Sequence, residues 1–303
     1  MAASPSESNS KFCTSSDGTL IYAEASGTPT NPSIVFAHGF ALSGIVFDRL
    51  FADERMLGAL YLASIIACFI HMHNSLLVRY DVRGHGRSGK PTTPEGYASA
   101  LYAADFAAVV EGFGLHMPVF VGWSAGAPII SDICTHISPV PLRGAIAMSG
   151  ALCVATSANT LKPKLIDLFR RMHVSDNAHT AFTTRTEFVD ACFKHPEDVP
   201  FNIKAAWVGC TVLQTPDIVS AIDTGHRPDQ GRLVELGREG LPVMVLYGTA
   251  DELQDGEVVA EDAGRYFRDL EVVAVEGGSH AVFYDEVDET VGRIVGFCER
   301  VNR

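Results

Sequence analysis

Short apolar runs alternate with segments of helical spacing along most of this 303-residue chain. Runs of this length suit strands that are buried on both faces of a parallel sheet. Because strands that alternate with helices pack as one sheet with helices on both faces, we predict an α/β fold with a mostly parallel, eight-stranded-type sheet. The expected strands are Lys11–Cys13, Leu20–Ala25, Ser33–Ala37, Leu76–Asp81, Val119–Gly122, Gly144–Met148, Val243–Tyr247 and Leu270–Val275. The expected core helices are 101–113, 125–137, 258–267 and 287–301.

The strand rhythm stops between residues 151 and 235, where short helical segments dominate. We interpret this stretch as a helical cap inserted between two strands of a core that residues 1–150 and 236–303 form. The serine-rich residues 1–10 are expected to be a disordered tail. The cap helices are expected at Leu161–Met172, Arg185–Phe193 and Ile203–Leu213.

Residues 54–75 depart from this plan because they contain the apolar run Met56–Ile70, followed by His71-Met72-His73-Asn74. The run is shorter than the roughly 20 residues of a membrane span and lacks a strong amphipathic pattern. Three interpretations stay open: a hairpin that touches a membrane or a partner, a lengthened helix packed on the core, or translated intron sequence. Sequencing the mature transcript across the region would decide whether it is intron.

Charge and cysteine content exclude several classes of partner and site. A formal net charge of −13 disfavours nucleic acid and anionic membranes as partners. The seven cysteines are odd in number, widely spaced and free of CxxC, which argues against a disulfide framework or a thiolate zinc site. The polar N-terminus lacks the apolar region of a signal peptide. We therefore expect a cytoplasmic protein without a metal, a cofactor or a stable membrane span, and leave its oligomeric state open.

A candidate nucleophile lies in Gly122-Trp123-Ser124-Ala125-Gly126, between an expected strand and an expected helix. A sharp strand-to-helix turn leaves no space for large neighbours and exposes the serine hydroxyl. The backbone N–H of Ala125 would then face developing negative charge at a helix N-terminus. An idle serine in a tight turn is the structural alternative.

A serine hydroxyl needs a base, and His280 follows the last expected strand in Gly277-Gly278-Ser279-His280. The glycines would let this loop reach back to the edge of the sheet. Among the 11 histidines, His280 is the one whose position completes the chain order serine, acid, histidine. A histidine on a surface loop is the alternative.

The acid is expected just after the preceding strand, at Asp251 in Tyr247-Gly248-Thr249-Ala250-Asp251. A buried carboxylate there would hold the imidazole in the required tautomer and stabilise its charged form. Glu252 and Asp255 are nearby alternatives.

Substrate-binding groups are expected from an early loop and from the cap. In Phe36-Ala37-His38-Gly39-Phe40 the backbone N–H of Phe40 is the predicted second oxyanion donor, and His38 is expected to brace the loop. Trp123 and the cap residue Trp207 are further candidates for contact with substrate. The aromatic content of the cap indicates an apolar substrate group of modest size.

Together these motifs resemble the α/β-hydrolase family. The resemblance rests on His38–Phe40, Arg79–Ser88, GWSAG, YGTAD and GGSH, which occur in the family's order from about Gly18 onward. Within the family the chain is most similar to small capped serine esterases and cofactor-free haloperoxidase-like members. The resemblance implies a Ser124–His280–Asp251 triad.

One competing motif is rejected. Gly84-His85-Gly86-Arg87-Ser88-Gly89 matches the dinucleotide pattern G-x-G-x-x-G, but Pro91 and Pro94 prevent a helix from starting where the pyrophosphate would need it.

From the serine, histidine and acid motifs, the predicted function is hydrolysis of a small carboxylic ester through an acyl-enzyme. The alternatives are a C–C bond hydrolase or lyase on the same triad, and a non-catalytic small-molecule binder.

Overall fold

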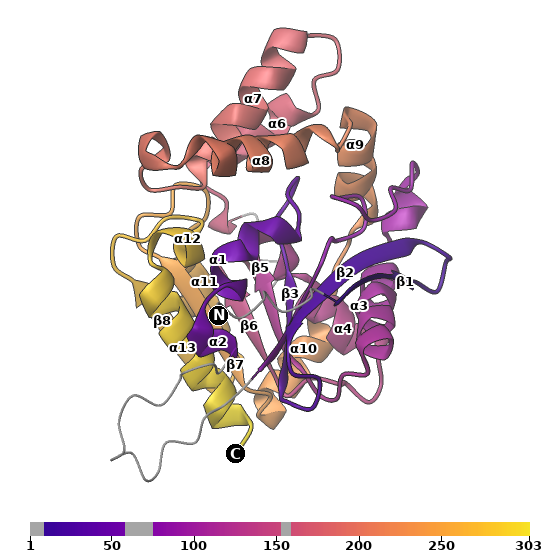
Figure 1. The fold of residues 1–303 in the computed structure, drawn as a ribbon, viewed down its shortest axis with the longest axis vertical. Helices are drawn as coiled ribbons and strands as arrows, with labels where there is room; N and C mark the ends of the chain where they lie inside the picture. The colour runs from indigo at the N-terminus through magenta and orange to yellow at the C-terminus, as the bar shows by residue number, and fades with distance from the viewer. Residues whose placement is uncertain (1–8, 58–74, 153–158) are drawn as a thin grey trace, which may run out of the picture.

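An eight-stranded sheet runs through the centre of the computed structural model, which describes residues 9–57, 75–152 and 159–303 (Figure 1). The strand order is β1-β2-β4-β3-β5-β6-β7-β8. Strand β2 is antiparallel to both of its neighbours, β1 and β4. All the other neighbouring pairs, from β4 through to β8, are parallel. The predicted fold class is confirmed. The strands are β1 Asn9–Thr14, β2 Leu20–Gly27, β3 Ser33–Ala37, β4 Leu76–Tyr80, β5 Val119–Trp123, β6 Gly144–Met148, β7 Val243–Gly248 and β8 Leu270–Val275.

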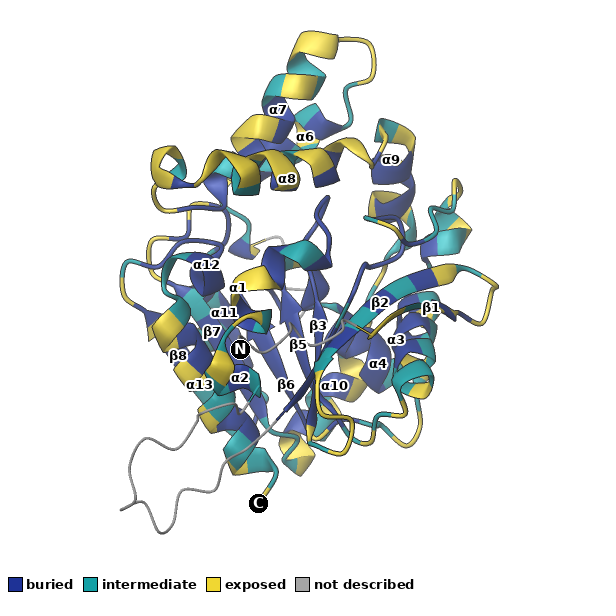
Figure 2. Cartoon of the chain, in the orientation of Figure 1, coloured by how far each residue is buried: buried dark blue, intermediate teal, exposed yellow. Residues whose placement is uncertain are grey.

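Burial follows the position of each strand in the sheet (Figure 2). Every residue of β3, β5 and β6 is buried, as expected for central parallel strands that helices cover on both faces. Near the edge, β2 alternates buried with more exposed residues because one of its faces meets solvent. The continuous apolar runs of the sequence therefore mark the middle of the sheet, where the candidate nucleophile follows β5.

Two groups of helices cover the sheet. In one group, α3 and α10 pack against α4; in the other, α1 and α2 pack with α13. Helix α3 ends at Gly114, whose φ of +60° is the left-handed conformation that favours glycine at a helix C-terminus. The core helices are α1 Asp48–Phe51, α2 Glu54–Leu57, α3 Ser99–Phe113, α4 Ile129–His136, α10 Gly231–Glu239, α11 Gly256–Gly264, α12 Val282–Asp285 and α13 Val287–Val301; short 3₁₀ turns are Gly44–Phe47, Pro94–Tyr97, Ser124–Gly126 and Pro196–Asp198.

Between β6 and β7 the chain forms helices that stand over the sheet (Figure 1). They are α6 Pro163–Met172, α7 Ala178–Ala191, α8 Phe201–Val212 and α9 Pro216–Gly225. The following helix, α10, begins at Gly231 and packs against α4, so the chain is back beside the sheet before residue 235. We call residues 151–235 the cap, and the division of the chain into a core and this cap stays a prediction.

Two expectations about unusual segments meet the structure only in part. Strand β1 begins at Asn9, so Asn9 and Ser10 belong to the sheet and not to a disordered tail. Of the 54–75 insertion, Glu54–Leu57 form helix α2, whereas residues 58–74 lie outside the described residues. The three interpretations of the insertion therefore stay open. None of the helices in the described part of the chain has the length and apolar character that crossing a membrane requires.

Candidate active site

Ser124 lies on a strained turn between β5 and α4. Its φ is +53°, a conformation that costs a non-glycine residue free energy and is found at functional turns. A side chain at Gly122 would overlap the Gly126 carbonyl, and one at Gly126 would overlap the Ala37 carbonyl. Both glycines of the motif are therefore required by close backbone packing. The predicted 125–137 helix differs in detail: a 3₁₀ turn covers Ser124–Gly126, and α4 begins only at Ile129.

The structure brings Ser124, His280 and Asp251 into one chain of hydrogen bonds. His280 Nε2 lies 2.9 Å from Ser124 Oγ, and His280 Nδ1 lies 2.8 Å from Asp251 Oδ2. The histidine and the aspartate are each 1% exposed, whereas Ser124 is half-buried. In this geometry a neutral His280 donates its Nδ1 proton to the carboxylate and accepts the serine proton at Nε2.

The acid loop after β7 explains why Asp251, and not its neighbours, meets the histidine. Asp251 Oδ1 accepts hydrogen bonds from the backbone N–H groups of Leu253 at 2.8 Å and Gln254 at 3.0 Å. This leaves Oδ2 for His280. Asp255 caps α11 by accepting from the Val258 N–H, and Glu252 pairs with Lys164 at the surface. The two alternative acids therefore have other partners.

The loop after β3 places Phe40 beside the serine. His38 Nδ1 donates to the Gly39 carbonyl at 2.8 Å, and His38 Nε2 accepts from the Val82 N–H at 3.0 Å. Burial lowers the pKa of His38, which favours this neutral form. A side chain at Gly39 would approach Ser124 Cβ to 3.0 Å, so the loop and the elbow lie in close contact. These contacts tie the His38 side chain to its own loop and to the segment after β4; its bracing role stays a prediction.

Two backbone donors remain available beside the hydroxyl. Within the described ranges, neither the Phe40 N–H nor the Ala125 N–H donates to a protein acceptor. Ala125 is exposed, and the Phe40 ring packs edge-on against Phe169 of the cap with centroids 5.0 Å apart. The two amides are therefore available to an acceptor, and the aromatic ring of Phe169 lies next to Phe40.

The two tryptophans predicted as substrate contacts belong to a buried aromatic cluster. Trp123 and Trp207 are 1% and 2% exposed, and their ring centroids lie 5.9 Å apart. The indole N–H of Trp123 donates to the His280 carbonyl at 2.9 Å, a contact that sequence reasoning missed. Trp123 and His280 are 157 positions apart, and a single sequence contains no signal for such a contact. Contact of the two tryptophans with substrate stays a prediction.

Among the described side chains, one group has the spacing that a metal ion could use. The ligand atoms of His195, Glu197 and Asp198 lie within 4.8 Å of one another, but all three residues are exposed. Exposed acidic groups commonly occur without an ion, and no reaction step needs one at this position.

Comparison with known proteins assigns the chain to a family. Residues 34–293 match the family model described as "Alpha/beta hydrolase family". A non-heme chloroperoxidase of Streptomyces lividans is 24% identical over 89% of this chain and 92% of its own length. A bifunctional esterase/perhydrolase of Acinetobacter calcoaceticus is also 24% identical, over 93% of this chain and 96% of its own.

A solved structure shares the fold. The structure of an esterase from Rhodococcus sp. ECU1013 superposes with a TM-score of 0.79 at 22% identity, and the match covers 96% of this chain and 99% of that one. The names of these relatives agree with the predicted enzyme class, an esterase-like hydrolase. The family model spans most of β3, strands β4 to β8, the cap and all three residues of the hydrogen-bonded chain, and we conclude that this protein belongs to the alpha/beta hydrolase family.

Proposed function

We propose that the protein is a serine hydrolase that cleaves small carboxylic esters through an acyl-enzyme intermediate. The observation that carries the proposal is the continuous hydrogen-bonded chain from Ser124 Oγ through His280 to Asp251. Two of the relatives described above are named esterases, which supports the same bond class.

In the proposed reaction, Ser124 Oγ attacks the ester carbonyl while His280 Nε2 takes its proton. The carbonyl oxygen becomes an oxyanion, which the N–H groups of Phe40 and Ala125 stabilise. His280 then gives the proton to the departing alcohol. A water molecule activated by His280 attacks the acyl-enzyme and releases the acid.

Asp251 acts on the histidine and not on the substrate. Its Oδ2 fixes the Nδ1-protonated tautomer, which leaves the Nε2 lone pair directed at Ser124. Because both residues are buried, the carboxylate also stabilises the imidazolium that forms during the reaction in a site where water cannot do so.

The aromatic surface near Phe40 suits an apolar substrate of modest size. The Phe40 ring packs edge-to-face with both Phe169 of α6 and His85, with ring centroids 5.0 and 5.9 Å away. Aromatic side chains bury large areas of apolar ligand surface. We therefore expect short-chain or aryl esters to be better substrates than charged esters.

A fluorophosphonate probe and a short-chain nitrophenyl ester test the proposal, with the Ser124→Ala variant beside the wild type. We expect covalent labelling and ester turnover in the wild type, and the loss of both in the variant. A folded wild type that neither reacts with the probe nor hydrolyses the ester would overturn the proposal and favour a non-catalytic binder.

A further inference from the structure

The cap segment that follows α7 holds the loop that carries His280. The backbone carbonyl of Cys192 accepts hydrogen bonds from the Ser279 hydroxyl and from the Ala281 N–H, each at 2.8 Å. Ser279 and Ala281 are the two neighbours of His280 in the chain. A single cap carbonyl therefore fixes the base on both sides, although 87 residues separate Cys192 from Ser279.

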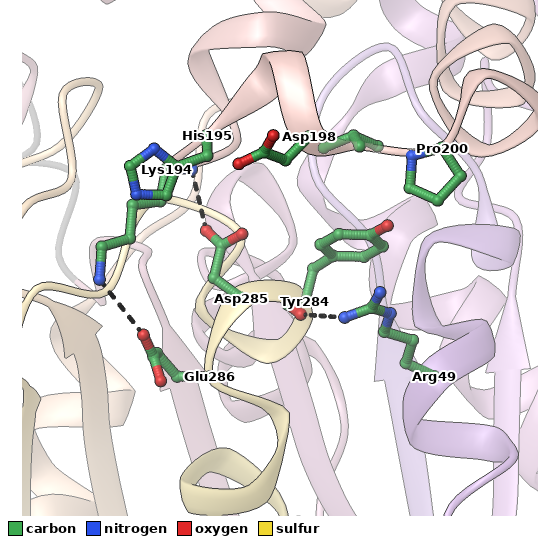
Figure 3. A pocket seen from close by; sticks show the side chains of 9 residues that line it. Arg49, Lys194, His195, Asp198, Pro200, Tyr284, Asp285 and Glu286 are labelled. Carbon is green, nitrogen blue, oxygen red and sulfur yellow. Dashed lines mark hydrogen bonds and ion pairs between the residues drawn. The ribbon is translucent and has the colours of Figure 1, made fainter.

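Asp285 completes this contact from the core side. Its Oδ2 accepts a hydrogen bond from the backbone N–H of Lys194 at 3.0 Å, and it also lies within short hydrogen-bonding distance of the Ser279 hydroxyl, whose single proton it shares with the Cys192 carbonyl. One carboxylate oxygen thus joins the cap backbone to the residue before the base. Figure 3 shows the bond from Lys194 to Asp285 and the adjacent ion pair of Lys194 with Glu286.

Asp285 is itself held in place through its neighbour Tyr284. The guanidinium of Arg49 lies 3.7 Å from the centre of the Tyr284 ring, and its Nη1 donates to the Tyr284 carbonyl at 2.7 Å. The Tyr284 ring also packs edge-on against Phe193, which lies between Cys192 and Lys194. The contact between Phe193 and Tyr284 therefore packs the cap segment that follows α7 against α12.

The outer side of this contact is open to solvent. Arg49, Lys194, Tyr284, Asp285 and Glu286 line a surface pocket of about 280 Å³ (Figure 3). The inner side is closed, because Ser279 is 3% exposed and His280 is 1% exposed. Asp285 thus lies at the boundary between solvent and the base loop and does not touch the reacting atoms.

We propose that Asp285 is a positioning residue that couples docking of the Cys192–Lys194 segment to the alignment of His280. The catalytic part of this inference rests on the proposed function. When the segment is docked, Cys192 and Asp285 together hold Ser279, so His280 Nε2 stays directed at Ser124. Without the Asp285 carboxylate, Ser279 and the Lys194 N–H lose their common acceptor, and the base loop gains freedom to rotate His280 away.

The test compares Asp285→Ala, Asp285→Asn and Ser279→Ala with Glu289→Ala, a control on α13 whose side chain pairs at the surface with Arg293. We expect Asp285→Ala to lower kcat about 10- to 100-fold with little change in KM, because misplacing a catalytic group costs rate and not binding. Asparagine keeps an oxygen acceptor and should recover activity to within about threefold of wild type. The Ser279→Ala loss should be smaller, because Asp285 still accepts from the Lys194 N–H and the Ala281 N–H still reaches Cys192.

A pH–rate profile and amide hydrogen exchange make the outcome decisive. A loosened base should shift the acid limb of the Asp285→Ala profile, whereas a purely structural defect would lower the whole profile without moving it. Exchange should rise in both segments, 192–194 and 277–285, and in neither for Glu289→Ala. If Asp285→Ala folds with wild-type kcat and exchange, or only KM changes, the proposal is wrong.

The exchange measurement needs no turnover, so it judges the coupling even for a wild type that hydrolyses no ester. That second result would overturn the proposed function alone. If Asp285→Ala does not fold, the Ser279→Ala variant decides. Wild-type kcat and exchange in Ser279→Ala would contradict the coupling. Raised exchange of Ser279→Ala in both segments would support it.

Discussion

The acid loop and the base loop meet at one hydrogen bond but are held in different ways. Asp251 organises its own turn, because its Oδ1 accepts from backbone N–H groups two and three residues further on. The neighbours of His280 are held instead by Cys192 of the cap and by Asp285 of α12. Local sequence therefore fixes one half of the candidate triad, whereas tertiary contacts with the cap, together with Asp285 of α12, fix the other half.

The cap touches both loops, but with different consequences. At the acid loop, Lys162 Nζ donates to the Asp251 carbonyl at 2.5 Å and the Lys162 N–H to the Leu253 carbonyl at 2.9 Å. These contacts reach the backbone of a turn that already closes on itself. At the base loop, the cap contacts bracket the catalytic candidate, so we expect disturbance of the cap to affect His280 before it affects Asp251.

The largest expected effect comes from breaking the bond between the loops with Asp251→Asn. Asparagine can keep the two backbone hydrogen bonds at Oδ1 while its amide faces His280 Nδ1 and disfavours the required tautomer. We expect kcat to fall by about 10⁴ with the fold retained. Ester kinetics and a urea unfolding curve check both parts.

Asp251→Ala is the matched variant for this comparison. It removes the contact to His280 and also leaves the Leu253 and Gln254 N–H groups without their acceptor. It should lose as much activity as asparagine and a further 1–3 kcal/mol or so of unfolding free energy. Equal stability of the two variants would show that the acid loop is not organised by its own carboxylate.

A smaller effect is expected where the two loops cross, at Gly248. A methyl group there would overlap the backbone carbonyls of Gly278 and Ser279 and force the loops apart. We expect Gly248→Ala to lower kcat about 100-fold, the loss that a displacement of roughly 1 Å can produce. Gly292→Ala on α13 is the control, since its added methyl meets no atom within 4 Å and should stabilise the helix slightly. Wild-type kinetics in Gly248→Ala would mean that the crossing can relax.

Much of this site could be predicted from the sequence, and the two loops show why the rest could not. Alternating apolar runs located all eight strands, and the chain order serine, acid, histidine selected the residues that the structure brings together. The hydrogen bonds from Trp123 to the His280 carbonyl and from Ser279 to the Cys192 carbonyl form only when the chain is folded. Because they join residues far apart in the sequence, no local sequence pattern predicts them. The start of α4 was misplaced because the strained turn at Ser124 delays the helix.

A few-fold effect is expected from Trp123→Phe, which keeps an aromatic ring in the cluster but removes the donor to the His280 carbonyl. Because the base loop keeps its Cys192 contacts, we expect kcat to fall only about three- to tenfold and stability by about 1 kcal/mol. Combining this change with Ser279→Ala in a double-mutant cycle should give a loss greater than the sum, since both act on one loop. Strict additivity would show that the two contacts act independently.

The smallest effect on kcat is expected at His85, whose substitution separates the pH dependence of the base from that of the fold. Burial, and next the neighbouring His38, lower the pKa of His85 from 6.5 to about 3, and the His85 ring lies beside Phe40. Since the unfolded chain binds a proton at His85 between these values and the folded chain does not, stability rises with pH across this window. The stabilisation is complete above about pH 6.5 and is lost towards pH 3, by up to about 1.4 kcal/mol per pH unit.

The His85→Asn variant tests this assignment, because asparagine can keep the donor to the Arg83 carbonyl but does not titrate. Urea unfolding at about pH 5 and about pH 7 should show a smaller stability difference in the variant than in the wild type. Ester kinetics on the same samples would then report the protonation of His280 without a contribution from unfolding. If wild type and variant lose stability in parallel on acidification, the acid sensitivity of the fold does not come from His85, and the acid limb of the activity profile has to be assigned to the base loop alone.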